Sequence, residues 1–390
     1  MKPPVLHRVL TLWPLIFYGL GVIVGAGIYV ALGAVMRRAG QAAPISFLLA
    51  GVCAGLTGLC YAEFAGRFPE ASGGVAYVRH GFGSDRLAQA TGLAVTVTVA
   101  VSAASIAAGT IHYLSVLVPL SAPLLIVVLI LGCTCIALLG VGQSVGLASA
   151  IGALEVLGLL AATAAGFIAA PDLDLSGILP RTAAAWSGTF AGAFIAFFAF
   201  IGFETLANMG EEVKDPGSTL PKGILGAMGA SIALYLLVVI AVVLSDRQGA
   251  NPLTGLFEGN AAMVFATAAA LAVGNGVLVQ IIMLSRLYYG MASKGELPAI
   301  LGRVHPATRT PVLATLLAGG VVLMVTLLVP FERLLTLSNG LTLGIFTLVD
   351  LALWRVRRRG PPARGFRVAG WVPLAAAALS LGLLLTEILS

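Results

Sequence analysis

Charge is scarce in this chain of 390 residues, because Asp, Glu, Lys and Arg together make up only 10% of it. Ordinary soluble domains have about 25%. Hydrophobic residues make up 59%, and the mean hydropathy is +1.03. A soluble protein of this size cannot hide so much apolar surface in one core. The composition therefore excludes a soluble globular enzyme and a disordered protein, and it indicates a chain that faces lipid.

Cysteine and histidine are also scarce, with four residues of each. The cysteines lie in two apolar runs, without a C-x-x-C spacing or a neighbouring histidine: Cys53, Cys60, Cys133 and Cys135. We expect four buried thiols and no metal site. H-E-x-x-H and Walker motifs are absent, and the G-x-S-x-G match at 142–146 falls in a loop between apolar runs. The sequence thus lacks the parts of a membrane hydrolase or an ATP-driven pump, and we expect no cofactor.

Long apolar runs are what the sequence has instead. A membrane-spanning helix needs about 20 mostly apolar residues, and eleven stretches meet this requirement. They cover roughly residues 13–36, 44–66, 86–113, 122–140, 146–170, 189–210, 222–245, 259–291, 312–330, 334–354 and 369–388. The first run is too long for the apolar part of a cleavable signal peptide. We therefore expect an all-α polytopic membrane protein with about eleven transmembrane helices.

The basic residues indicate an orientation. If the N-terminus lies in the cytoplasm and the spans alternate, 17 of the 22 Lys and Arg residues lie on the cytoplasmic side and 5 outside. Cytoplasmic loops carry an excess of Lys and Arg. The asymmetry predicts a cytoplasmic N-terminus in a multi-pass protein of the plasma (inner) membrane.

Two spans carry glycine in mid-membrane. Residues 17–33 read FYGLGVIVGAGIYVALG, and residues 194–212 read FIAFFAFIGFETLANMGEE. They belong to the first and sixth spans, so they occupy equivalent positions if spans 1–5 and 6–10 form two inverted repeats. Interrupted helices at matching positions mark the binding site of many secondary transporters.

Gly25-Ala26-Gly27 in the first span allows two interpretations. Glycine permits a helix break at low steric cost, and the freed amides at a half-helix N-terminus would suit a carboxylate. Alternatively, Gly21-x-x-x-Gly25 is a packing motif that lets helices approach closely.

Three of the acids in or beside the spans are candidates for a role. Glu204 in the sixth span is either functional or a structural carboxyl that supports the broken helix. Glu155 in the fifth span has no charge nearby in sequence, and we interpret it as a group that exchanges a proton, the alternative being a permanently protonated carboxyl. Glu63 stands four residues before Arg67, a spacing that predicts an ion pair at the membrane interface.

Four stretches resemble one known family. They are GLGVIVGAGIYV in the first span, FPEASGGVAYVRHGFG at 68–83, FFAFIGFETLANMGEEVKDPGSTLP at 197–221 and SRLYYGMASKGELPAILGRVHPATRTP at 285–311. They look like the first helix, the loop between helices 2 and 3, the sixth helix with its following loop, and the end of the eighth helix of the amino acid–polyamine–organocation superfamily. Within it, the chain is similar to bacterial permeases of the cationic amino acid transporter branch.

The resemblance implies a LeuT-type fold: two inverted five-helix repeats, with helices 1 and 6 unwound at mid-membrane, plus one extra helix. It implies that an α-amino acid binds between the two broken helices. The substrate carboxylate would meet backbone amides of Gly25, Ala26 and Gly27. The ammonium would meet backbone carbonyls of the broken helices, and these substrate-binding positions carry over as Ile23, Phe198, Ala199 and Ile201, with Gly202 beside them. An aromatic side chain of helix 6, Phe200 or Phe203, would gate the site.

The sequence departs from the family pattern at two points. Relatives commonly have a lysine in the fifth helix that takes the place of a sodium ion, and Glu155 occupies that position here. A carboxylate would therefore hold the coupling proton or cation. Glu204 is the other coupling candidate. Many relatives also have a twelfth helix. The expected division is a cytoplasmic N-terminus (1–12), first repeat (13–170), extracellular loop (171–188), second repeat (189–354), basic cytoplasmic loop (355–368) and helix 11 (369–390).

We therefore expect a secondary transporter, not an enzyme, that moves amino acids by alternating access through proton symport or amino acid exchange. Its partners would be the amino acid, protons as a coupling ion and membrane lipid, without nucleic acid; the sequence does not give the oligomeric state. Export of amino acids, or of a polyamine or amine, is an alternative. A membrane amino-acid sensor is the alternative outside transport.

Overall fold

The computed structural model describes residues 10–388 except 26, 70–72, 141–144, 171–174, 211, 247–250, 294, 307 and 360–364, and the side chains of 145–149. Nearly all of the described part is helical. Its one β-type pairing is an isolated bridge between Leu10 and Val213.

The helices follow the predicted spans closely. In the first half they are α1 (Leu12–Val24), α2 (Gly27–Ala39), α3 (Ala43–Arg67), α4 (Gly73–Phe82), α5 (Asp85–Leu117), α6 (Ala122–Leu138) and α7 (Val145–Ala169), with the 3-10 turn η1 (Gly40–Ala42). In the second half they are α8 (Ala183–Ala196), α9 (Phe203–Ala207), α10 (Pro216–Leu244), α11 (Gly259–Ser293), α12 (Val312–Leu328), α13 (Phe331–Arg359) and α14 (Val372–Ile388), with the 3-10 turns η2 (Phe197–Phe200), η3 (Thr254–Leu256) and η4 (Ala299–Gly302).

Seven helical stretches of the described chain are long and apolar enough to cross a membrane, and three shorter apolar helices accompany them. The first stretch, Leu12–Arg67, contains the first two predicted spans, so all eleven spans are accounted for. Large apolar side chains remain exposed on many helices, as lipid-facing surfaces require: examples are Leu157, Val264, Leu271 and Leu328. The chain is a multi-pass membrane protein.

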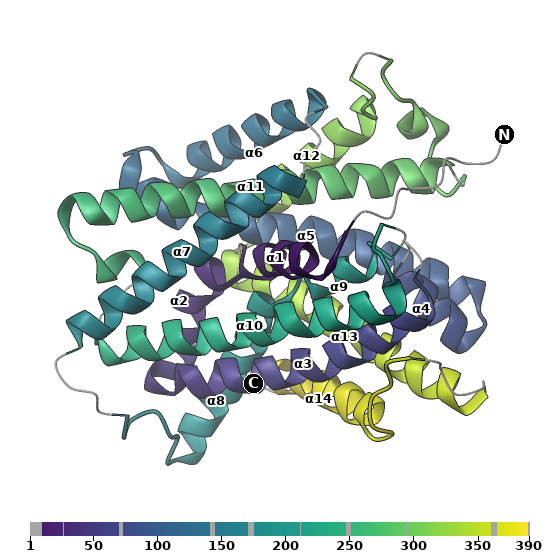
Figure 1. The fold of residues 1–390 in the computed structure, drawn as a ribbon. Helices are drawn as coiled ribbons and strands as arrows, with labels where there is room; N and C mark the ends of the chain where they lie inside the picture. The colour runs from purple at the N-terminus through teal and green to yellow at the C-terminus, as the bar shows by residue number, and fades with distance from the viewer. Residues whose placement is uncertain are drawn as a thin grey trace.

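The arrangement is of the LeuT type, with helices 1–5 (α1/α2, α3, α5, α6 and α7) followed by helices 6–10 (α8/η2/α9, α10, α11, α12 and α13). Broken helices 1 and 6 lie inside the bundle (Figure 1), where α1 packs against α7 and α10, and α2 against α8. The extra helix α14 packs along α13 and α3. We call the end where α1 begins and α3 and α13 end the N-face; α2 and α5 end at the opposite face.

Small residues set the spacing of the central helices. A methyl group added to Gly152 of α7 would lie 2.6 Å from the Cα of Gly21, so the backbones of α7 and α1 nearly touch. Gly21 therefore serves helix packing, as one of the two interpretations of its motif requires.

Two details differ from the sequence-based expectation. Residues of the predicted loop between helices 2 and 3 form α4, because Ala76, Tyr77 and Val78 bury their side chains in the bundle. Cys135 is exposed, whereas the other three thiols are buried, because its side chain lies on the outward side of α6.

Candidate substrate site at the two helix breaks

The first transmembrane helix is interrupted between α1 and α2. Gly25 has φ −10° and ψ −117°, outside the helical region, and its N–H donates to Gly21 O at 3.0 Å. Ala26 lies outside the described residues. A methyl group on Gly27 would lie 2.7 Å from the Cα of Ala199, so glycine lets the break in helix 1 contact the break in helix 6.

The sixth helix unwinds over a longer stretch. After η2, Ile201 is extended, with φ −66° and ψ 136°, and Gly202 has φ +131°, a value that favours glycine. A methyl group on Gly202 would lie 3.0 Å from Val22 O in helix 1. The half-buried Glu204 accepts the Gly202 N–H at its Oε2 (2.8 Å), so this carboxyl supports the break.

Tyr235 of α10 joins the two breaks. Its hydroxyl lies 2.8 Å from Ile23 O and 2.9 Å from Ala199 O. Both carbonyls stand where the regular helical hydrogen bonding of helices 1 and 6 is interrupted, and a single O–H donates to one of them at a time. The Ile23 and Ala199 carbonyls, both predicted to meet the substrate ammonium, therefore converge on the Tyr235 hydroxyl. Sequence reasoning missed Tyr235, although a hydroxyl in the apolar seventh span has to find a partner.

Glu155 of α7 lies beside the break in helix 1. Its side chain is 3% exposed, and a methyl group on Gly25 would lie 3.8 Å from its Oε1. The backbone is fixed there by two tyrosines: Tyr29 donates to Glu155 O at 2.8 Å, and Tyr113 donates to Tyr29 O at 2.8 Å. The structure thus brings this buried carboxyl to the glycine motif.

The two aromatic residues predicted as gates point to different neighbours. Phe200 packs on Tyr235, with ring centroids 5.2 Å apart. Phe203 packs between Tyr61 of α3 (5.5 Å) and Phe346 of α13 (5.2 Å). Phe200 therefore lines the side of α10, and Phe203 the side of α3 and α13.

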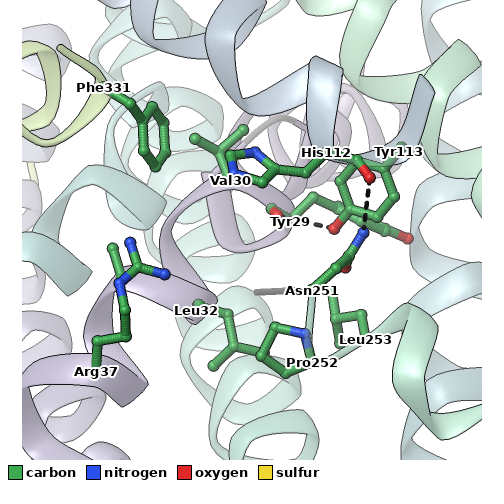
Figure 2. Close-up of a pocket in the computed structure, with 12 residues that line it drawn as sticks. Tyr29, Val30, Leu32, Arg37, His112, Tyr113, Asn251, Pro252, Leu253 and Phe331 are labelled. Carbon is green, nitrogen blue, oxygen red and sulfur yellow. Dashed lines mark hydrogen bonds between the residues drawn. The ribbon is translucent and has the colours of Figure 1, made fainter. Parts of the chain in front are cut away.

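A hollow lies next to the break, toward the opposite face (Figure 2). Its polar and aromatic lining comes from α2, α5, the segment before η3 and the start of α13: Tyr29, Arg37, His112, Tyr113, Asn251 and Phe331. Asn251 Nδ2 donates to His112 O at 3.4 Å. Because these residues are far apart in sequence, no local pattern predicts the hollow. Tyr29 connects it to the backbone of Glu155.

Ion pairs and a backbone bridge join chain segments at the N-face. The buried Glu63 carboxylate pairs with Arg67 at 2.6 Å, which confirms the predicted pair, and also with Arg357 of α13. It accepts the Val368 N–H at 2.9 Å as well. Leu10 pairs with the segment after α9 through its backbone. These contacts hold the ends of helices 1, 2, 6 and 10 together.

Comparisons with known proteins give the family of the chain. The sequence model of the amino acid permease family matches residues 10–388. Cationic amino acid transporter 9 (chloroplastic) of Arabidopsis thaliana is 32% identical over 332 residues, 77% of this chain and 58% of the relative. Two Bacillus subtilis proteins are similar over 94% of the chain: the methylthioribose transporter (29% identical, 85% of it covered) and the branched-chain amino acid permease BcaP (27%, 84%).

The fold has a solved counterpart. A manganese transporter of Eremococcus coleocola superposes with a TM-score of 0.61 at 14% identity, covering 97% of this chain and 86% of that one. The chain spans between 58% and 65% of the length of the first Arabidopsis transporters that it matches.

Proposed function

Because the chain belongs to the amino acid permease family, we propose that it is a secondary active transporter of amino acids that works by alternating access. The observation that carries this proposal is the contact between two helix breaks, whose Ile23 and Ala199 carbonyls converge on one point. Binding sites of this fold lie where two discontinuous helices meet.

The substrate would bind through both of its charged groups. Amides of Gly25, Ala26 and Gly27, at the N-terminus of α2, would meet the carboxylate. Carbonyls at the breaks would meet the ammonium: Ile23, Phe198, Ala199 and Ile201. Gly202 keeps the second break close to the first. The ammonium would compete with or share the carbonyls that Tyr235 now reaches.

Coupling would involve Glu155, because it is buried beside the break in helix 1. An ionisable side chain inside the membrane destabilises the protein, so its presence there points to a role in transport. Glu204 is the weaker candidate, since its carboxylate already accepts the Gly202 N–H. Phe203 would act as the gate toward the N-face and Phe200 as a wall of the site.

The proposed orientation places the N-face in the cytoplasm of a cell with the protein in its plasma membrane. The excess of Lys and Arg at that end supports it. The hollow would then open toward the outside while the cytoplasmic ends stay closed by Glu63, Arg67 and Arg357.

Uptake into proteoliposomes tests the proposal. Purified protein is supplied with a panel of radiolabelled amino acids, with and without an inward proton gradient, and with or without amino acid inside. Accumulation that requires the gradient identifies a proton symporter, and uptake that requires only internal amino acid identifies an exchanger. Absence of uptake in every arm contradicts amino acid transport. Methylthioribose as a competitor checks the substrate class of one relative.

Export of amino acids or transport of a polyamine is the second candidate, because the same fold can work in either direction. Efflux of preloaded radiolabelled amino acid with no amino acid outside the liposomes would indicate export. Competition by a polyamine against amino acid uptake would indicate polyamine transport.

A further inference from the structure

A third buried acid, Asp350 of α13, has no part in the site described above. Its side chain is fully buried at 0% exposure, about 14 Å along the helix from Arg359. We propose that Asp350 is a proton-binding site between α3 and α13, which holds a proton in this conformation and releases it when the N-face opens. The link to transport rests on the proposed function; proton binding itself does not.

Burial and an unpartnered oxygen favour the carboxylic acid form of Asp350, and its one hydrogen-bond donor at measured distance does not offset them. Thr57 of α3 donates its hydroxyl to Oδ2 at 3.0 Å, and the Cys60 thiol lies beside the same carboxyl. Oδ1 is buried without a hydrogen-bond partner among the described residues. A negative charge on such an oxygen inside a membrane protein is costly, and a proton on the carboxyl removes that cost.

No cation in the described part of the chain balances the carboxyl. Arg357, two turns further along α13, is paired with Glu63 instead. No group of three metal-ligating side chains occurs among the described residues, and a thiol is a poor ligand for a hard cation such as sodium. A proton is therefore the ligand that fits.

Few other ionisable groups face Asp350 from the packed elements. Those of α5 lie near its two ends: Asp85, paired with Arg79, and Arg86 at its start, and His112 beside Phe331 at the start of α13. The described part of α8 and η2 offers none, and α14 has only Glu387, which accepts from Thr336 near the other end of α13. The groups nearby are Cys53, Cys60, Tyr61 and Glu63 of α3, Tyr77 of α4, Glu204 of α9 and Arg357.

Aromatic rings connect Asp350 to the break in helix 6. Tyr61, next to Cys60, and Phe346, one turn before Asp350, pack edge to face with 5.4 Å between their ring centroids. Phe203 at the start of α9 packs on both rings, at 5.5 Å and 5.2 Å. A movement of α9 would therefore displace Tyr61, a neighbour of the carboxyl, and Phe346, one turn away from it, and so link the exposure of Asp350 to the state of the substrate site.

The neighbouring elements also cover the Asp350 carboxyl and set the route by which its proton reaches water. α14 covers the seam between α3 and α13, where Cys53 and Ser380 lie 3.6 Å apart. The ion pairs of Glu63 lie between Asp350 and the N-face. When these pairs separate, water reaches the carboxyl, its O–H bond breaks, and the proton passes to water, leaving a carboxylate.

Infrared spectroscopy and transport on the full-length protein test the proposal with Asp350→Asn, which keeps an acceptor for Thr57. Asp85→Asn is the matched control, because Asp85 is exposed and pairs only at the surface with Arg79. The carbonyl stretching band of buried protonated carboxyls should be as strong in D85N as in the wild type and weaker in D350N, where Glu155 accounts for any band that remains. In liposomes, D350N should lose accumulation driven by a pH gradient at least tenfold, while D85N keeps it.

The proposal is overturned by an unchanged infrared band in D350N, by gradient-driven accumulation by D350N at the wild-type level, or by accumulation driven by sodium instead of protons. Equal loss of exchange and accumulation in D350N also overturns it, since the residue would then serve the fold. A wild type that carries no amino acid contradicts the proposed function, and the infrared band still decides whether Asp350 holds a proton.

Discussion

At the scale of the residue, the Tyr235 hydroxyl is the main polar contact between the two breaks. Tyr235→Phe removes the donor that serves Ile23 O and Ala199 O. We expect a destabilisation of about 1–3 kcal/mol, because buried acceptors lose their partner. A substrate ammonium would supply donors, so saturating substrate should raise the unfolding temperature more in Y235F than in the wild type.

Thermal unfolding of the detergent-solubilised protein, with and without substrate, measures both effects. Tyr289→Phe is the control, since Tyr289 is 38% exposed on α11. An equal substrate effect in Y235F and the wild type would mean that the ammonium does not bind at these carbonyls.

Sequence reasoning reached some residues and not others. Glu155 and the glycine motif were predictable, since a lone acid and clustered glycines stand out in apolar runs. Asp350 also lies in a predicted span, four residues before the expected end of that span at 354. The helix α13 continues to Arg359, so Asp350 lies further from the helix end than the sequence suggested. The convergence of Ile23 and Ala199 on Tyr235 depends on three helices packing together, which no local pattern encodes.

At the scale of the element, the break in helix 6 depends on Gly202. Gly202→Ala places a side chain at φ +131° and 3.0 Å from Val22 O. We expect a cost of roughly 1–3 kcal/mol and loss of most transport, because the breaks would be forced apart.

Gly229→Ala provides the matched comparison. A methyl group there meets nothing within 4 Å, and alanine favours the helix α10. Transport rates and unfolding temperatures of the two variants are measured together. If G202A transports as well as G229A, the break does not need its glycine and the account of helix 6 is wrong.

The helices themselves were largely predictable, because a membrane span must satisfy its backbone hydrogen bonds within its own helix. All eleven spans are helical, and the interruptions fall at the predicted glycines in helices 1 and 6. The helix α4 was not anticipated, since its burial depends on contacts with α5 and α13.

At the scale of the whole molecule, the two faces differ. The N-face is held by the pairs of Glu63 and by the Leu10 bridge, and the hollow lies toward the opposite face. The helix breaks thus lie between an end held by ion pairs and an end with a small hollow, an asymmetry that the proposed alternating-access cycle would use.

The central claim is that two helix breaks recognise the carboxylate and the ammonium of one amino acid. Its most direct test is competition against uptake of a transported, radiolabelled amino acid by proteoliposomes. The competitors are the same amino acid unlabelled, its amide, and the amine that lacks the carboxylate. We predict that the free amino acid competes fully, while the amide and the amine lose at least tenfold in potency. Equal competition by the amine would contradict the account.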